Sequence, residues 1–154
     1  MAAVRPCLQD RLARHAPYSY RDDAAVPKFP DDKPLIVFDG VCVLCSGFVR
    51  FVVARDPGAA FRLTTAQSTI GQALLRHYGL DTVDFESNLV LSQGRAYAKL
   101  DTLAITGERI GGPWRLLGVV RVLPRALADN RYALFGRHER CMMPPPDWHE
   151  RFLQ

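Results

Sequence analysis

The sequence predicts an α/β fold with a central mixed sheet of about four strands, flanked by helices and followed by extra C-terminal helices. A buried apolar run, Leu35–Phe38, is followed by a helical stretch at residues 42–54 and an alternating run at residues 61–64. Two apolar runs then flank Gln93-Gly94, a typical hairpin turn. Because two strands joined by a helix run parallel and a hairpin is antiparallel, we expect a mixed sheet.

Composition limits the class of protein. The chain has 154 residues, of which 48% are hydrophobic and 23% charged, which is ordinary for a globular domain with a real core. The net charge of +4 comes from scattered arginines rather than a dense basic block, which argues against nucleic-acid binding. We also expect no membrane span and no secretory signal, and therefore a cytoplasmic protein.

The first part of the chain differs from the rest. Residues 1–33 contain four prolines and two pairs of adjacent aspartates, so we expect an N-terminal arm that is irregular or partly disordered. The arm could wrap the domain through Tyr18, Tyr20 and Phe29, or it could be simply disordered. Residues 34–154 are expected to form the domain, with a C-terminal helical extension and a tail.

Local signals place the remaining helix boundaries. Ser68 is suited to cap a helix over residues 69–78. Asp101 is suited to cap a short helix over residues 102–106, which Gly107 would end. Two further helical segments are expected at residues 114–123, which follow Pro113, and at residues 126–135.

The most informative motif is the pair Cys42 and Cys45, which lies where the first strand gives way to the first helix of the domain. Two residues three apart on a helix face the same side, so the two thiols can pair. The helix N-terminus favours the thiolate form of the first cysteine. A CxxC at this point of a strand–helix–strand unit is the thioredoxin-like arrangement, with Cys42 as the nucleophile and Cys45 as the resolving thiol.

Asp39 precedes the cysteines and admits several roles. A carboxylate close to Cys42 would raise the pKa of that thiol through like-charge repulsion. Asp39 could instead accept the proton of Cys45 as a general base, contact the substrate, or only cap the turn at Gly40.

Two alternatives stay open: a non-catalytic partner-binding domain on the same fold, and a structural domain in which the cysteines are metal ligands. His138 and Cys141 could complete a zinc site with Cys42 and Cys45, although the spacing of the second pair is looser than a second CxxC. Cys141 could also be a third redox thiol or a packing residue of the tail.

The other candidates have no motif around them. Cys7 reads as a free thiol, and the expected surface or satisfied histidines are His15, His77 and His149. Trp114 and Trp148 are expected to pack. Four arginines could recognise an anionic substrate, but a solvated face is the simpler reading: Arg50, Arg121, Arg131 and Arg137.

The stretch from Val37 to Cys45 resembles the signature of the DCC family, predicted thiol–disulfide oxidoreductases with an Asp-x-x-Cys-x-x-Cys motif. Residues 61–68 and the C-terminal block, which contains Asn130-Arg131-Tyr132, Phe135-Gly136 and Cys141, resemble the family as well. The resemblance spans residues 35–153.

It implies a thioredoxin-like fold with Asp39, Cys42 and Cys45 as motif residues. The resemblance implies little about the substrate. From the cysteine pair we expect no further cofactor, and a protein or small-molecule disulfide or dithiol as substrate. The electron donor stays open. Residues 84–88 contain no proline, whereas thioredoxins place a cis-proline opposite their CxxC.

Overall fold

A four-stranded sheet forms the centre of the computed structural model, in which residues 8–41, 43–85, 87–122 and 151–153 are described. The strand order is β2-β1-β3-β4. β1 pairs in parallel with β2 and antiparallel with β3, which in turn pairs antiparallel with β4. The predicted mixed sheet is confirmed, and its order is that of the thioredoxin-like α/β fold. The strands are β1 (Leu35–Phe38), β2 (Arg62–Thr65), β3 (Leu89–Ser92) and β4 (Arg95–Ala98).

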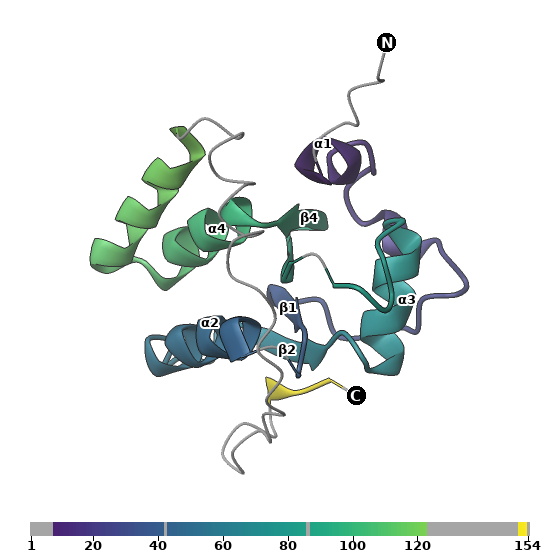
Figure 1. Ribbon diagram of the computed structural model, residues 1–154, viewed down its shortest axis with the longest axis horizontal. Coiled ribbons are helices and arrows are strands. Elements are labelled where there is room, and N and C mark those ends of the chain that lie inside the picture. Colours follow the sequence, from purple (N-terminus) through teal and green to yellow (C-terminus); the bar gives the residue numbers. More distant parts are fainter. Residues whose placement is uncertain (1–7, 42, 86, 123–150, 154) are drawn as a thin grey trace.

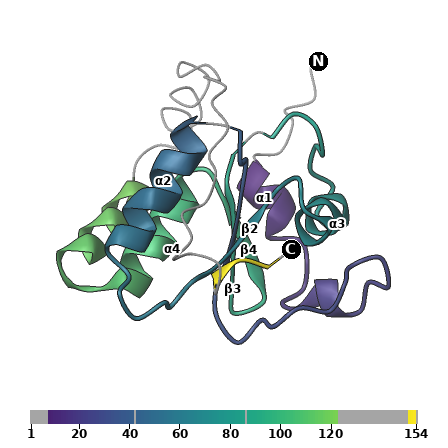
Figure 2. The same ribbon diagram turned by 90° about the horizontal axis from the view of Figure 1, so that it is seen from below.

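Helices cover both faces of this sheet. Figures 1 and 2 show one group on one face and a second group on the other. The first group is α2 (Val43–Ala54), α4 (Leu100–Ile110) and the 3₁₀ helix η2 (Gly112–Val122). The second is α1 (Leu8–Leu12) and α3 (Thr69–His77), with the short 3₁₀ helix η1 (Ser19–Arg21) in the N-terminal segment.

β1 contributes side chains to both cores, one on each face of the sheet. All four of its side chains are at most 2% exposed. Leu35 and Val37 belong to the core beneath α3, whereas Ile36 and Phe38 belong to the core beneath α2. Because successive side chains of a strand point to opposite faces, a strand covered on both sides must be apolar throughout. Burial on both faces of the sheet is why residues 35–38 form a continuous apolar run.

The junction between β2 and α3 is tightly built. Ser68 is the N-cap of α3, as predicted, and its hydroxyl accepts the backbone N–H of Gly71 at 3.0 Å. A Cβ at Gly71 would overlap the carbonyl oxygen of Thr65, so only glycine allows α3 to approach the end of β2 this closely. This packing fixes the short loop between β2 and α3 relative to the sheet.

The predicted short helix that ends at Gly107 is wrong. α4 runs through that position to Ile110, and Gly111 at its C-cap has a φ of 80°. Gly107 is buried against η2, where an added Cβ would lie 2.9 Å from the Cβ of Leu117 and overlap the carbonyl oxygen of Trp114. The glycine therefore serves helix packing instead of ending the helix. Asp101 is also not the N-cap, because Lys99 holds that position.

The N-terminal segment packs against the α3 face of the sheet. Leu8, Leu12, Tyr20 and Val26 are buried in that core, and Tyr18 and Phe29 pack against it. The backbone N–H of Tyr18 donates to the carbonyl oxygen of Gly94 in the hairpin turn at 2.9 Å. Residues 8–33 thus contribute to the same core as the sheet, while the predicted boundary between residues 33 and 34 stays a prediction.

The last described residues lie beside β2. Phe152 forms a parallel bridge with Leu63, and the N–H of Leu153 donates to the carbonyl oxygen of Leu63 at 2.8 Å. Phe152 also packs edge-on against Phe38, with ring centroids 6.0 Å apart. Figure 1 shows this C-terminal piece next to β2. The helical segment predicted at residues 126–135 lies outside the described residues.

Candidate active site

The carboxyl end of β1 is the point where the first sequence motif meets the sheet. Asp39 follows directly after β1 and is only 7% exposed. Its Oδ1 atom accepts the backbone N–H of Val41 at 3.0 Å. This is an Asx-type turn, in which the side chain replaces a backbone acceptor and directs the chain from the strand toward α2.

A second side chain holds the same turn from the neighbouring loop. The amide nitrogen of Gln67 donates to Oδ1 of Asp39 at 2.7 Å, and its amide oxygen accepts the N–H of Gly40 at 3.3 Å. Gln67 lies between β2 and α3. The adjacent Ala66 donates its N–H to the carbonyl oxygen of Phe38 at 2.8 Å. The β1–α2 and β2–α3 loops are therefore joined by both side-chain and backbone hydrogen bonds.

Gly40 makes this close approach possible. A Cβ at that position would lie 3.2 Å from Cγ2 of Thr65 and 3.5 Å from the amide oxygen of Gln67. The first distance is tighter than ordinary van der Waals contact, so a side chain at this position would require Thr65 to shift by a few tenths of an ångström. Val41, the next residue, is 38% exposed and places an apolar side chain at the surface immediately before Cys42.

The two cysteines differ in how far the structure describes them. Cys45 belongs to the first turn of α2, which begins at Val43, one residue after the predicted start at residue 42. Cys42 and the side chain of Cys45 lie outside the described part of the chain. Their pairing and their separate roles therefore stay predictions. The amides at the start of α2 lack intrahelical acceptors and create a positive end that favours a thiolate.

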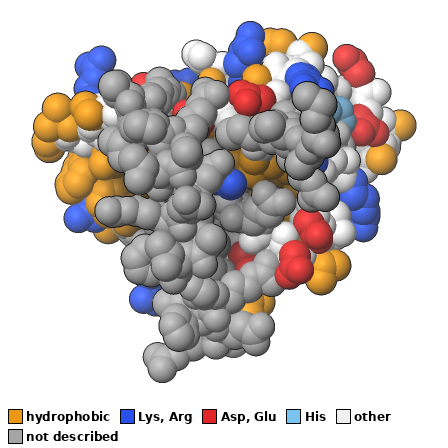
Figure 3. Space-filling model, turned by 45° about the horizontal axis from the view of Figure 1, so that its top comes forward, with side chains coloured by type: hydrophobic (Ala, Val, Ile, Leu, Met, Phe, Trp, Pro, Cys, Tyr) orange, Lys and Arg blue, Asp and Glu red, His pale blue; other side chains and the backbone are white. Residues whose placement is uncertain are grey.

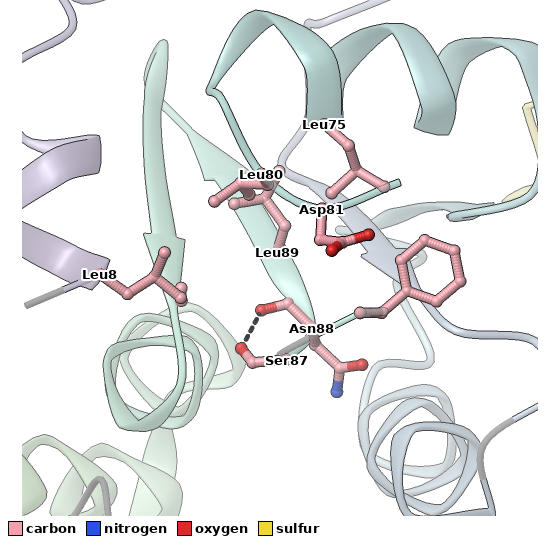
Figure 4. Close-up of a pocket in the computed structure, with 9 residues that line it drawn as sticks. Leu8, Leu75, Leu80, Asp81, Ser87, Asn88 and Leu89 are labelled. Carbon is pink, nitrogen blue, oxygen red and sulfur yellow. Dashed lines mark hydrogen bonds between the residues drawn. The ribbon is translucent and has the colours of Figure 1, made fainter. Parts of the chain in front are cut away.

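The residue before β3 is Asn88, at the place where thioredoxins have their cis-proline. Asn88 is 7% exposed, and its Oδ1 atom has no hydrogen-bond partner among the described residues. Val37 pairs with Leu89, so Asn88 lies one step further along, opposite the end of β1. Figure 4 shows its amide pointing away from Leu89 and Leu75. The part of the chain that the structure covers has no cis peptide bond.

The cavity drawn in Figure 4 is too small to hold a substrate. Most of its lining side chains are apolar, and its volume of about 10 Å³ is room for about one water molecule. Ser87 crosses one side of it, where its hydroxyl donates to the carbonyl oxygen of Asn88 at 2.7 Å. A larger hollow of about 360 Å³ is lined by residues 20–31 of the N-terminal segment, and no residue of the Asp39 turn lines it. Neither of these two cavities is lined by residues of the Asp39 turn.

Two of the histidines without a motif are satisfied structural residues. His77 contacts Asp23 through Nδ1 at 2.7 Å and the hydroxyl of Ser19 through Nε2 at 2.9 Å. His15 packs against the rings of His77 and Tyr78, and burial together with the neighbouring His77 lowers its pKa. These contacts tie the N-terminal segment to α3.

Among the remaining candidates, Trp114 packs as expected. Its ring meets Phe51 edge-on at 5.0 Å, and the Arg55 guanidinium lies 4.6 Å from the centre of its ring. Arg50 is exposed on α2. The other candidates, or their side chains, lie outside the described residues: Cys7, Arg121, Arg131, Arg137, His138, Cys141, Trp148 and His149.

The zinc alternative has no geometry to support it in the described part of the chain, where no three His, Cys, Asp or Glu side chains gather as a metal site. All four of its proposed ligand side chains fall outside that part.

On the described surface in Figure 3, basic and acidic side chains are interspersed. Apolar ones gather at the left, the side on which η2 lies in Figure 1. Leu116 and Val119 of η2 are 73% and 59% exposed.

A family model named DCC1-like thiol-disulfide oxidoreductase matches residues 36–142. The chain belongs to this family. The match begins in β1 and includes the Asp39 turn, both cysteines and Gln67, so the family sequence and the geometry of the junction coincide. Membership supports a general role in thiol–disulfide exchange, and it confirms the resemblance drawn from the motif.

Two relatives extend this comparison. The chain is 37% identical over 127 residues to the uncharacterized protein YuxK of Bacillus subtilis, covering 77% of this chain and 93% of YuxK. It is 33% identical over 120 residues to the chloroplastic DCC family protein At1g52590 of Arabidopsis thaliana, covering 72% of this chain and 70% of that protein. No solved structure gives a significant match to the chain. None of the described helices is long and apolar enough to cross a membrane.

Sequence reasoning missed one member of the site. Gln67 stood in the sequence only as part of a block that resembles the family, and no local pattern assigned it a partner. Its two contacts join residues 27 and 28 positions apart, which periodicity cannot reveal. The sequence nevertheless carried a signal for this pairing, because the carboxyl ends of neighbouring parallel strands lie at one edge of a sheet. Polar residues just after β1 and β2 are therefore natural partners.

Proposed function

We propose that this protein is a dithiol–disulfide oxidoreductase that uses Cys42 and Cys45 through a mixed-disulfide intermediate. The observation that carries the proposal is the position of the CxxC motif between β1 and α2 of a thioredoxin-like sheet, inside the family match. A helix N-terminus at this point favours the thiolate that disulfide exchange requires.

In the reductive direction, the Cys42 thiolate attacks one sulfur of a substrate disulfide. A new S–S bond forms between Cys42 and that sulfur, and the other substrate sulfur leaves as a thiolate. The Cys45 thiolate then attacks Cys42, releases the second substrate thiolate and leaves a Cys42–Cys45 disulfide. Two electrons pass to the substrate, and two protons convert its thiolates to thiols. An external dithiol restores the reduced pair.

Asp39 is proposed to assist the second step. It is buried at the turn before α2, and its Oδ1 atom already accepts two hydrogen bonds. This supports its role in shaping the turn and keeps a carboxyl group close to the helix start. As a general base it would take the proton of Cys45 when that thiol becomes the nucleophile.

The substrate class follows from the surface of the junction. The exposed Val41 immediately before Cys42 favours an apolar chain that carries a cystine, or a small disulfide. The reducing cytosol is the proposed compartment, where a CxxC is more often catalytic than a static crosslink. The plant relative is chloroplastic, so fractionation of tagged protein is the direct check.

Mixed-disulfide trapping tests the two cysteine roles. Cys45→Ser removes the resolving thiol, so disulfide-linked adducts through Cys42 should accumulate on a non-reducing gel of alkylated cells. Cys42→Ser removes the nucleophile, so adducts should stay at the level of the double variant. Equal trapping by both single variants, or by neither, contradicts the assigned roles.

The same purified protein separates this function from a metal site. The redox function predicts metal-free protein with a reversible Cys42–Cys45 disulfide, detected by mass spectrometry before and after reduction. Stoichiometric zinc, together with unfolding on chelation, would instead make the cysteines structural ligands. His138→Ala and Cys141→Ser are the matched variants, because each should lower zinc content only in that case.

A further inference from the structure

We propose that Gln67 is the positioning residue of the dithiol site: its amide holds the Asp39 carboxyl group and the Asp39–Val41 turn in one orientation, and Gln67 acts on the cysteines only through Asp39. The inference rests on the proposed function, because it concerns how the same site is tuned. It goes further by naming a residue on a different loop from the motif.

The geometry requires a primary amide at this position. The nitrogen of Gln67 donates to Asp39 at 2.7 Å while its oxygen accepts from Gly40 at 3.3 Å. One end of the side chain must be a donor and the other an acceptor. Glutamate lacks the donor and lysine lacks the acceptor, so neither can make both contacts.

The anchor of Gln67 is rigid. On one side Ala66 is buried and bonded to the end of β1. On the other side Ser68 caps α3 and also bonds the hydroxyl of Thr64 at 2.7 Å. A side chain held from both sides can fix a partner loop, whereas one on a free loop cannot.

The contact also affects the charge of the turn. Oδ1 of Asp39 receives two donors, the backbone N–H of Val41 and the amide of Gln67. Donors aimed at a carboxylate offset part of its negative potential. Loss of the Gln67 donor leaves Asp39 with only the N–H of Val41 to hold its carboxyl group, and less of the carboxylate's negative potential is offset. A more negative surrounding disfavours a thiolate and raises the pKa of a nearby thiol.

The test measures the reactivity of Cys42 in a Cys45→Ser background, by the rate of iodoacetamide alkylation against pH. Gln67→Met keeps the volume of the side chain but removes both hydrogen bonds. We expect it to raise the pKa of the Cys42 thiol and slow alkylation at neutral pH about threefold or more. In an Asp39→Asn background, the same substitution should change the rate little, because the partner charge is gone.

Gln72→Met is the matched control. The amide of Gln72 also makes two bonds, to the carbonyl oxygens of Ala66 and Thr82 at 2.9 and 3.0 Å, but none to the turn. It should lower thermal stability without changing the alkylation profile.

An unchanged or faster rate in Gln67→Met overturns the inference. So does an equal slowing in the Asp39→Asn background or in Gln72→Met. Each of these outcomes can occur while Cys42 still traps substrates, so failure of this inference is distinguishable from failure of the proposed function.

Discussion

At the scale of single residues, two glycines with different surroundings give a direct test of packing. A Cβ at Gly71 would overlap the carbonyl oxygen of Thr65 and lie 2.9 Å from the Cα of Ala66. A Cβ at Gly47 in α2 meets nothing within 4 Å. The first glycine allows backbone contact, whereas the second only weakens a helix.

Gly71→Ala should therefore destabilise the protein by about 1–3 kcal/mol, because α3 must move away from β2. Gly47→Ala should stabilise it by about 0.5–1 kcal/mol through helix propensity. Urea unfolding followed by circular dichroism measures both. A neutral Gly71→Ala would mean that the β2–α3 junction can relax, and would weaken the claim that Gln67 is rigidly anchored.

At the scale of elements, an arginine fixes the last described residues to the turn between α2 and β2. Arg151 donates to the carboxylate of Asp56 at 3.2 Å and to its backbone oxygen at 2.8 Å. Asp56 is 6% exposed and also accepts the N–H groups of Ala60 and Phe61. The carboxylate of Asp56 thus holds both the turn between α2 and β2 and the segment that contains Arg151.

We expect Arg151→Ala to cost about 1–3 kcal/mol of unfolding free energy, because a buried carboxylate loses a charged donor. Arg151→Lys should recover only part of this, since a single ammonium cannot reproduce the two-pronged contact. Arg62→Ala is the comparison, as its ion pair with Asp32 is more exposed and should contribute less than about 1 kcal/mol. Equal losses from Arg151→Ala and Arg62→Ala would show that burial of Asp56 is unimportant.

At the scale of the whole molecule, the N-terminal segment makes stability dependent on pH. Hydrogen bonds from Arg21 lower the pKa of Asp31 below its ordinary 3.8, and those from His77 and Arg62 lower the pKa of Asp23 and Asp32. A carboxyl group with a lowered pKa stabilises the fold above its ordinary value, and this stability is lost as pH falls through the folded value.

The free energy of unfolding should therefore decline below about pH 4 as these carboxylates take up protons. The lowered pKa of His15 adds a loss in the same direction that starts near its ordinary value of 6.5. Asp31→Asn should flatten the acid limb, whereas Asp22→Asn, at an exposed neighbour, should not. A profile that keeps its slope in Asp31→Asn would argue against a stabilising role for the Arg21–Asp31 pair.

The sequence predicted the elements whose signals are local. The run at residues 35–38, the cap at Ser68 and the turn at Gln93-Gly94 all match the structure. It failed at Gly107, because whether a glycine ends a helix or receives a neighbouring helix depends on tertiary contacts. It also missed the pairing of Phe152 with β2 and the partners of Gln67, since both join distant segments.

Both outer strands of the sheet are engaged by the ends of the chain. On β4, the side-chain amide of Gln9 accepts the N–H of Ala98 and donates to the carbonyl oxygen of Ala96, as a neighbouring strand would. On β2, the backbone N–H of Leu153 donates to the carbonyl oxygen of Leu63. Exposed sheet edges invite β-augmentation and aggregation, and these contacts block such strand addition where they occur. Under the proposed function, a disulfide-bearing chain would therefore reach the site across the carboxyl end of β1 rather than by extending the sheet at these contacts.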